Sequence, residues 1–320
     1  MKKNPKSTSK APVEPKVTSV FGPLILGKSL FYNDVCQQLY FVDTHSYDIH
    51  RFDPKTNEHI IAKLGELPLA FVIPVATIVN HFIVGAGPQI IEITWDGKSE
   101  NIEQQKVLQT VDKSYGCGIN NAIVTPRGSL FISTFSETES GETQFGKSAI
   151  LKYKNNQLTP VLTKLSIPNG MTFSLCGKTF YLADSHTTSV DSFCYNVETE
   201  EISKREVFFD FVQHQIEGNP YNVMTDGDGR IWVSACGGNL MIRVCQHEKK
   251  EILRVKFEAS VITSSCFATS FLREMYVTTG RYRLTEEELE RYPKSGYFFR
   301  LTNLGSIKGL RCRAFCPDNK

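Results

Sequence analysis

Two aspartates are spaced so that they could bind a metal ion. Asp226 and Asp228 alternate with glycines in the stretch DGDG, and aspartate oxygens are ligands that calcium prefers. A calcium loop would also need a glutamate further along at a fixed spacing, and none stands there. Aspartate and glycine are equally typical of tight turns between strands. We therefore interpret this stretch as a turn before the strand RIWVS.

The histidines and the known catalytic motifs give no stronger indication of chemistry. His45 and His50 are spaced to lie on opposite faces of a strand region, so we expect no shared metal site. His186 follows a strand and is interpreted as a polar group with a hydrogen-bond partner. The sequence contains no GxSxG, no HExxH and no phosphate-binding glycine-rich loop. Motifs alone therefore assign no acid, base or nucleophile.

The elements that must position any site are short strands that recur along the chain. Runs of β-branched and aromatic residues are bounded by Gly, Asn and Asp. Six runs begin 43 to 51 residues apart, at Leu39, Phe82, Leu130, Phe180, Ile231 and Met275. A repeat of about 40 to 50 residues made of strands is expected of propeller blades with four strands each. The predicted fold is an all-β, six-bladed β-propeller; a two-sheet sandwich would not explain six near-equal repeats.

The domain plan follows from the same patterns. Residues 1–16 are rich in Lys, Pro and Ser and are predicted to form a disordered basic tail. Residues 17–320 are predicted to form the single propeller domain. The one convincing helical pattern is TEEELER, with Thr285 as its N-cap. The nine cysteines are an odd number without a CxxC pair, which indicates reduced thiols.

The composition restricts the class of partner. Lys and Arg total 36 against 34 Asp and Glu, so no excess of positive charge is present to follow a nucleic-acid backbone. No apolar run is long enough to span a bilayer, and the first residues lack the apolar stretch of a secretory signal. We expect a cytoplasmic protein without nucleic-acid or membrane partners, and the sequence identifies no protein partner.

Several blocks, in order along the chain, resemble one family. LYFVDTHSYDIHRFDP, IPNGMTFS, DGDGRIWVSACGGNLMIRV and LTNLGSIKGL are similar to the family of senescence marker protein (regucalcin), gluconolactonase and luciferin-regenerating enzyme. The resemblance extends from about Gly22 to the C-terminus. It implies a six-bladed propeller with a divalent metal, by family norm calcium, on the channel axis. It also implies a hydrolase of lactones or related esters, in which a Glu, an Asn and an Asp hold the metal.

The family's functional residues are mostly replaced in this chain. Where the resemblance places the metal-binding Glu and Asp, this sequence has Lys28 and Tyr221, and only Asn169 matches a family ligand. In the substrate-side motif Asn120 is kept, whereas the acidic residue has become Asn121. Carboxylates normally offset the dehydration of a hard dication, and a lysine would repel it. We therefore expect no metal and no other cofactor at this site.

The paired substitutions suggest a site with a new use. The Lys28 ammonium would take the place of the ion, with its donors directed at groups such as Asn169 and Tyr221. We expect a pocket of Lys28, Asn120, Asn121, Asn169 and Tyr221 that binds a polar or anionic small molecule without lactonase activity. Two alternatives stay open. One is a retained lactone or ester hydrolase with Lys28 as base or electrophile and Tyr221 as proton donor; the other is a non-catalytic interaction scaffold.

Overall fold

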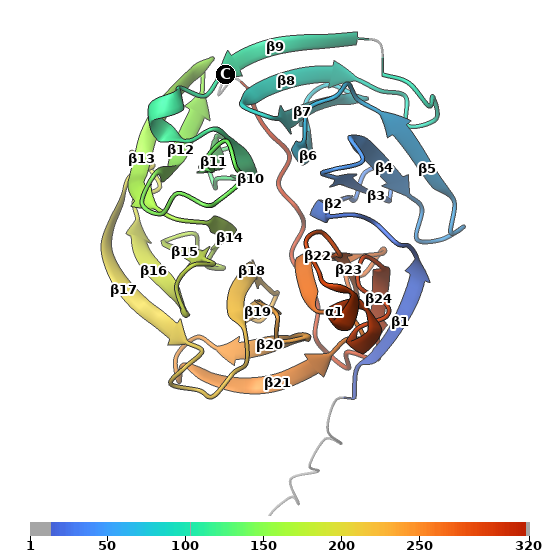
Figure 1. Cartoon of the computed structure of the whole chain (residues 1–320), viewed down its shortest axis with the longest axis vertical. Helices are drawn as coiled ribbons and strands as arrows, with labels where there is room; N and C mark the ends of the chain where they lie inside the picture. The colour runs from blue at the N-terminus through green and yellow to red at the C-terminus, as the bar shows by residue number, and fades with distance from the viewer. Residues whose placement is uncertain (1–13, 103, 318–320) are drawn as a thin grey trace, which may run out of the picture.

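The computed structural model describes residues 14–102 and 104–317. Residues 1–13 of the predicted tail (residues 1–16) lie outside the described residues. Lys16, the last residue of that predicted tail, is the first residue of strand β1 (Lys16–Phe21). The described strands pair antiparallel, and their sheets are arranged in a ring about a central axis, which is called the channel below (Figure 1). Because each sheet begins close to the channel and ends at the outside of the ring, the first strand of a sheet is the one that can present side chains to the axis.

Four of the sheets have four strands each, hydrogen-bonded in chain order. Their strands are β2 (Gly27–Asn33), β3 (Gln38–Asp43), β4 (Asp48–Phe52) and β5 (His59–Lys63); β6 (Leu69–Pro74), β7 (His81–Ala86), β8 (Gln89–Thr94) and β9 (Gln104–Thr110); β10 (Gly118–Val124), β11 (Leu130–Phe135), β12 (Ser148–Lys154) and β13 (Gln157–Leu165); and β14 (Pro168–Phe173), β15 (Thr179–Asp184), β16 (Ser189–Tyr195) and β17 (Ile202–Asp210).

The remaining strands form one eight-stranded sheet. Its first half is β18 to β21, and its second half contains β22, β23, β24 and the N-terminal strand β1, which pairs with β24. The strands that complete it are β18 (Asn219–Thr225), β19 (Ile231–Cys236), β20 (Leu240–Cys245), β21 (Lys250–Lys256), β22 (Val261–Ala268), β23 (Glu274–Gly280) and β24 (Phe298–Thr302).

The all-β propeller predicted from the sequence is confirmed, but six separate four-stranded sheets are not what the structure contains. Within the described residues, β19 and β22 pair at one position, Cys236 with Val261. Next to it the Gly237 N–H donates to the Ser260 carbonyl over 3.1 Å. The end of β19 therefore touches the start of β22, and this contact merges the last eight strands into one sheet.

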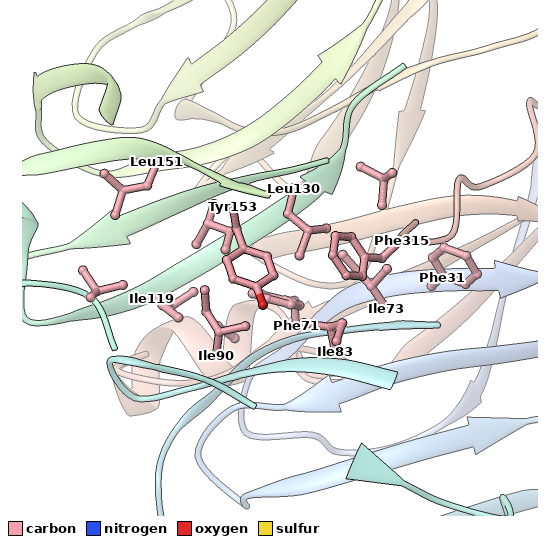
Figure 2. Close-up of a cluster of buried hydrophobic side chains, with 14 of the residues drawn as sticks. Phe31, Phe71, Ile73, Ile83, Ile90, Ile119, Leu130, Leu151, Tyr153 and Phe315 are labelled. Atoms are coloured by element: carbon pink, nitrogen blue, oxygen red, sulfur yellow. The ribbon is translucent and has the colours of Figure 1, made fainter. Parts of the chain in front are cut away.

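The core lies between neighbouring sheets. Inner strands such as β6 and β14 are buried at every position, whereas β21 at the outside alternates between exposed residues and half-buried or buried ones. Figure 2 shows one core cluster, in which Phe31 of β2, Phe71 of β6, Ile90 of β8 and Leu130 of β11 meet Phe315 from the C-terminus. Burial on both faces explains the continuous apolar run LAFVIP of β6.

The predicted helix is present as α1 (Glu286–Arg291). The Thr285 hydroxyl accepts the Glu288 N–H while the Glu288 carboxylate accepts the Thr285 N–H, so a capping box fixes its start. A short 3₁₀ helix, η1 (Lys113–Tyr115), precedes β10 and was not predicted. In the described part of the chain no helix has the length and apolar character needed to cross a membrane.

Candidate functional site

The predicted site residues lie on the inner strands of four strand groups, and the group β6–β9 contributes none of them. Lys28 is on β2, Asn120 on β10, Asn169 on β14 and Tyr221 on β18, and these strands border the central channel (Figure 1). The pairing of each strand with its neighbour changes register at or beside these positions. A β-bulge turns a side chain away from the regular alternation. The local backbone therefore explains why polar side chains can stand here within apolar strands.

Lys28 is almost completely buried, with 4% of its surface exposed. Its Nζ donates to the Asn120 Oδ1 over 2.6 Å and to the Asn120 carbonyl over 2.8 Å. Among the described residues no carboxylate lies within ion-pair distance of this ammonium. Burial without a negative partner disfavours the charged form and lowers the pKa of Lys28 from 10.5 to about 7.

A chain of amide hydrogen bonds continues from Lys28. The Asn120 Nδ2 donates to the Asn169 Oδ1 over 2.7 Å and to the Pro168 carbonyl over 2.9 Å. The Asn169 Nδ2 donates in turn to the Ser185 Oγ over 2.8 Å. The Asn121 Nδ2 donates to the Asn169 carbonyl over 2.7 Å. The ammonium thus reaches Asn169 through Asn120 and not directly.

Tyr221 stands apart from this network. None of the hydrogen bonds recorded for the described residues joins its hydroxyl to Lys28 or Asn169. Burial, with a smaller effect from the Cys236 thiol, raises the pKa of Tyr221. The strand that carries it is nonetheless close to β14, because a Cβ on Gly170 would stand 2.5 Å from the Tyr221 carbonyl oxygen. The structure therefore joins four of the five predicted residues by hydrogen bonds. The fifth, Tyr221, lies on β18, the inner strand next to β14.

Two loops meet above the network. The Arg283 Nη1 lies 3.5 Å from the Glu137 Oε1, and its Nη2 donates to the Gly141 carbonyl over 3.2 Å. Tyr282 stacks on His45 with 3.8 Å between ring centroids. The pKa of His45 is lowered by burial first, and the positive charges of Lys28 and Arg283 lower it further against the opposing effect of Asp43. Lys28 and Arg283 are thus both close enough to His45 to affect its charge, and only the tertiary structure brings Arg283 and Ser185 to this part of the molecule.

A cavity of about 180 Å³ lies along the channel beside the network. Ser29 and Asn121, each next in sequence to a network residue, line it together with Asn222 and Ser264. Residues 310–313 of the C-terminal segment (residues 303–317) line it as well. Of the five predicted residues only Asn121 is among the lining residues, so the other four border the channel without facing this cavity.

The DGDG stretch is a turn, as the sequence indicates. The Asp226 Oδ2 accepts from the Trp232 Nε1 over 2.9 Å and from the Arg243 Nε over 2.7 Å, and its Oδ1 accepts from the Asp228 N–H. Asp228 is paired with the Arg243 Nη2 at 2.7 Å. Over the described residues, no group of three or more His, Cys, Asp or Glu side chains is arranged to hold a metal ion. These aspartates therefore serve the fold of β19 and β20.

Comparisons with known proteins point to one family. The family model described as SMP-30/Gluconolactonase/LRE-like region matches residues 26–281. Regucalcin of Oryctolagus cuniculus is 33% identical over 215 residues, covering 66% of this chain and 71% of that protein. Human regucalcin is 28% identical over 287 residues, covering 89% of this chain and 92% of that protein. The similarity to these relatives thus extends through most of the propeller.

Solved structures agree in fold. A luciferin-regenerating enzyme superimposes with a TM-score of 0.87 at 25% identity, over 95% of this chain and 100% of that one. The calcium-binding protein regucalcin of Agrobacterium tumefaciens has a TM-score of 0.80 at 18% identity, over 94% of this chain and 96% of that one. With a family model that covers most of the chain, this protein belongs to the SMP-30/gluconolactonase/LRE-like family.

Proposed function

We propose that this protein binds a polar or anionic small molecule at the channel mouth and does not hydrolyse lactones by the metal-dependent route of its family. The observation that supports this proposal is the buried Lys28 ammonium, which is hydrogen-bonded to Asn120 and has no carboxylate partner among the described residues. A buried charge without a counter-charge is costly. An anion that reaches Lys28 supplies that counter-charge and gains a charge-assisted hydrogen bond.

The donor set also bears on the family's metal. Calcium requires several oxygen ligands, usually with carboxylates among them. At this site the Asn120 oxygens already accept from Lys28, and the Asn169 Oδ1 already accepts from Asn120. A dication here would displace these bonds and face a like charge. The residues therefore do not fit the metal, and we infer that the ammonium network has replaced it and that no cofactor is needed.

The number of blades in the ring depends on how the eight-stranded sheet is divided. We infer that the eight-stranded sheet acts as two blades, because its halves β18–β21 and β22–β1 each have four strands in blade order. Counted in this way, the ring has six blades like the family that the sequence resembles. The cytoplasmic location and the absence of membrane or nucleic-acid partners stay predictions from the sequence.

Binding of gluconate, compared with the neutral gluconolactone, tests the proposed function. In calorimetric titrations we expect gluconate to bind and the affinity to fall about tenfold or more between about pH 6.5 and about pH 8.5, because Lys28 loses its proton. The Lys28→Met variant should lose binding, and Lys55→Met, which changes an exposed lysine, should not. A thermal shift by calcium together with turnover of the lactone would refute the proposal.

One observation favours the hydrolase alternative. A lysine with a pKa of about 7 is largely neutral just above that pH, as a general base or nucleophile must be. Such an enzyme should hydrolyse gluconolactone in the presence of a chelator, with a rate that rises with pH through about 7 and disappears in Lys28→Met. Turnover that requires added calcium would instead indicate the family's metal-dependent route. No specific contact favours the scaffold alternative.

A further inference from the structure

The C-terminal segment crosses the middle of the ring (Figure 1). On one side the Gly309 N–H donates to the Leu272 carbonyl over 2.7 Å. On the other side the Phe315 N–H donates to the Pro74 carbonyl over 2.9 Å, and its carbonyl accepts the Ala76 N–H over 2.8 Å. The Phe315 ring enters the core cluster of Figure 2. The segment is therefore fastened at both ends to different parts of the ring.

The middle of the segment is held more weakly. Among the described residues, no hydrogen bond joins the backbone of positions 310–314 to the backbone of a strand. The ion pair of Arg311 with Asp34, at 3.1 Å, joins side chains that are 78% and 35% exposed, and exposed pairs contribute little. Because residues 310–313 line the channel cavity, the position of this span decides the shape of one cavity wall.

Two thiols meet at this span. Cys266 lies on β22 with 3% of its surface exposed, and Cys312 packs against the same apolar cluster from the middle of the C-terminal segment. The interaction between the two thiols raises the pKa of Cys266 and lowers the pKa of Cys312. Both cysteines also line the cavity. A strand of the channel wall and the crossing segment thus present their sulfurs to one another.

The surroundings shift the pKa values of the two thiols in opposite directions. The interaction with Cys266 is the main cause that lowers the pKa of Cys312, and the Tyr32 backbone adds to it. Burial is the main cause that raises the pKa of Cys266. A thiol with a lowered pKa is the better nucleophile near neutral pH, and a neighbouring thiol can then resolve its oxidised form. Cys312 is suited to react first and Cys266 second.

We propose that Cys266 and Cys312 are a redox-active thiol pair, and that oxidation by hydrogen peroxide joins them in a disulfide that ties the middle of the C-terminal segment to β22. The Cys312 thiolate attacks a peroxide oxygen, the O–O bond breaks, and a sulfenic acid forms as hydroxide leaves. The Cys266 sulfur then attacks the sulfenic sulfur, the S–S bond forms, and the S–O bond breaks. The two thiol protons leave in water, and the peroxide receives both electrons.

The consequence lies in the channel. A disulfide at this point fixes the span of residues 310–313 and with it one wall of the cavity. Inside a reducing compartment, disulfides are commonly transient and regulatory. The inference goes beyond ligand binding at Lys28 and does not depend on it, because it is argued from two thiols that are not among the five residues of the proposed ligand pocket.

Peroxide treatment of the full-length protein tests the pair. Freshly reduced protein is exposed to a small excess of hydrogen peroxide and alkylated, and its intact mass and non-reduced peptides are measured. Relative to reduced protein alkylated in the same way, we expect an intact mass lower by two alkyl groups and one linked peptide that contains Cys266 and Cys312. Cys266→Ser and Cys312→Ser should abolish the link, and Cys194→Ser, at an exposed cysteine of β16, should keep it.

Hydrogen exchange supplies a second measurement that needs no variant to fold. Exchange at positions 310–314 of the wild-type protein should slow by about tenfold or more on oxidation and recover on reduction. A link between other cysteines, a link that forms only in denaturant, or unchanged exchange after the link has formed would each overturn the proposal.

Discussion

At the scale of single residues, the charge of Lys28 is the property that most shapes the site. Its ammonium is buried, and its only recorded partners in the described chain are the two oxygens of Asn120. A lysine in this position holds its proton less tightly than in the unfolded chain. The protonation state of one side chain therefore links ligand binding and stability, and the two respond to pH in opposite directions.

The stability response can be measured. Between about pH 7 and about pH 10 the unfolded chain keeps the Lys28 proton while the folded protein loses it, so this group makes unfolding more costly as pH rises. Below the folded pKa both states are protonated, and the contribution no longer changes. Relative to Lys28→Met, the free energy of unfolding should rise by up to about 1.4 kcal/mol per pH unit in this window. Urea unfolding at several pH values measures it.

The control for this experiment is Lys55→Met, whose pH profile should match that of the wild type. Parallel profiles for the wild type and Lys28→Met would show that Lys28 keeps an ordinary pKa.

At the scale of the element, the bulged inner strands place polar side chains at the channel. This arrangement requires β14 and β18 to approach each other closely. Gly170 follows Asn169 on β14, and a Cβ there would lie 2.5 Å from the Tyr221 carbonyl oxygen and 2.6 Å from the Val223 nitrogen. Because both are backbone atoms, no side-chain rotation can relieve the contact. Glycine therefore permits the spacing between β14 and β18.

We expect Gly170→Ala to lower the free energy of unfolding by about 2 to 4 kcal/mol, because one of the two inner strands must move. Chemical denaturation measures the change. Gly146→Ala is the matched control: no atom lies within 4 Å of a Cβ built there, and only its φ of +70° opposes the substitution. That control should cost about 1 kcal/mol. Equal effects of the two variants would show that the strand contact is not tight.

At the scale of the whole molecule, the N-terminal strand closes the ring. β1 pairs with β24, so the first described strand completes the last group of strands. Phe21 at its end stacks on His59 of β5 at 3.9 Å and on Phe298 of β24 at 4.9 Å. One side chain thus connects the first sheet with the last. Contacts between distant parts of the chain stabilise a ring because they hold all the sheets together.

We expect Phe21→Ala to lower the free energy of unfolding by about 2 to 4 kcal/mol through the loss of these ring contacts. Phe271→Ala, which truncates a side chain that is 79% exposed, should change it by less than about 0.5 kcal/mol. Thermal unfolding of both variants checks the comparison. A Phe21→Ala protein as stable as the wild type would mean that closure rests on the backbone pairing of β1 alone.

Much of this architecture could be predicted from the sequence. The spacing of the strand runs is a local property of turns and apolar residues, and it predicts the propeller. The placing of Lys28, Asn120, Asn169 and Tyr221 at the channel followed instead from the resemblance to the family. The Thr285 cap and the DGDG turn are likewise local, because their hydrogen bonds join residues close in sequence. The sequence predicts well those features that depend on interactions between residues close together in the chain.

The tertiary structure decided the rest. That Lys28 bonds to Asn120, that Arg283 reaches Glu137, and that Cys266 meets Cys312 depend on contacts between strands and loops far apart in the chain. The merging of the last eight strands depends in the same way on Cys236 and Val261. The physical reason is that strand spacing sets the number of strand groups to be packed, whereas the packing of the closed ring sets how those groups join and which side chains share the channel.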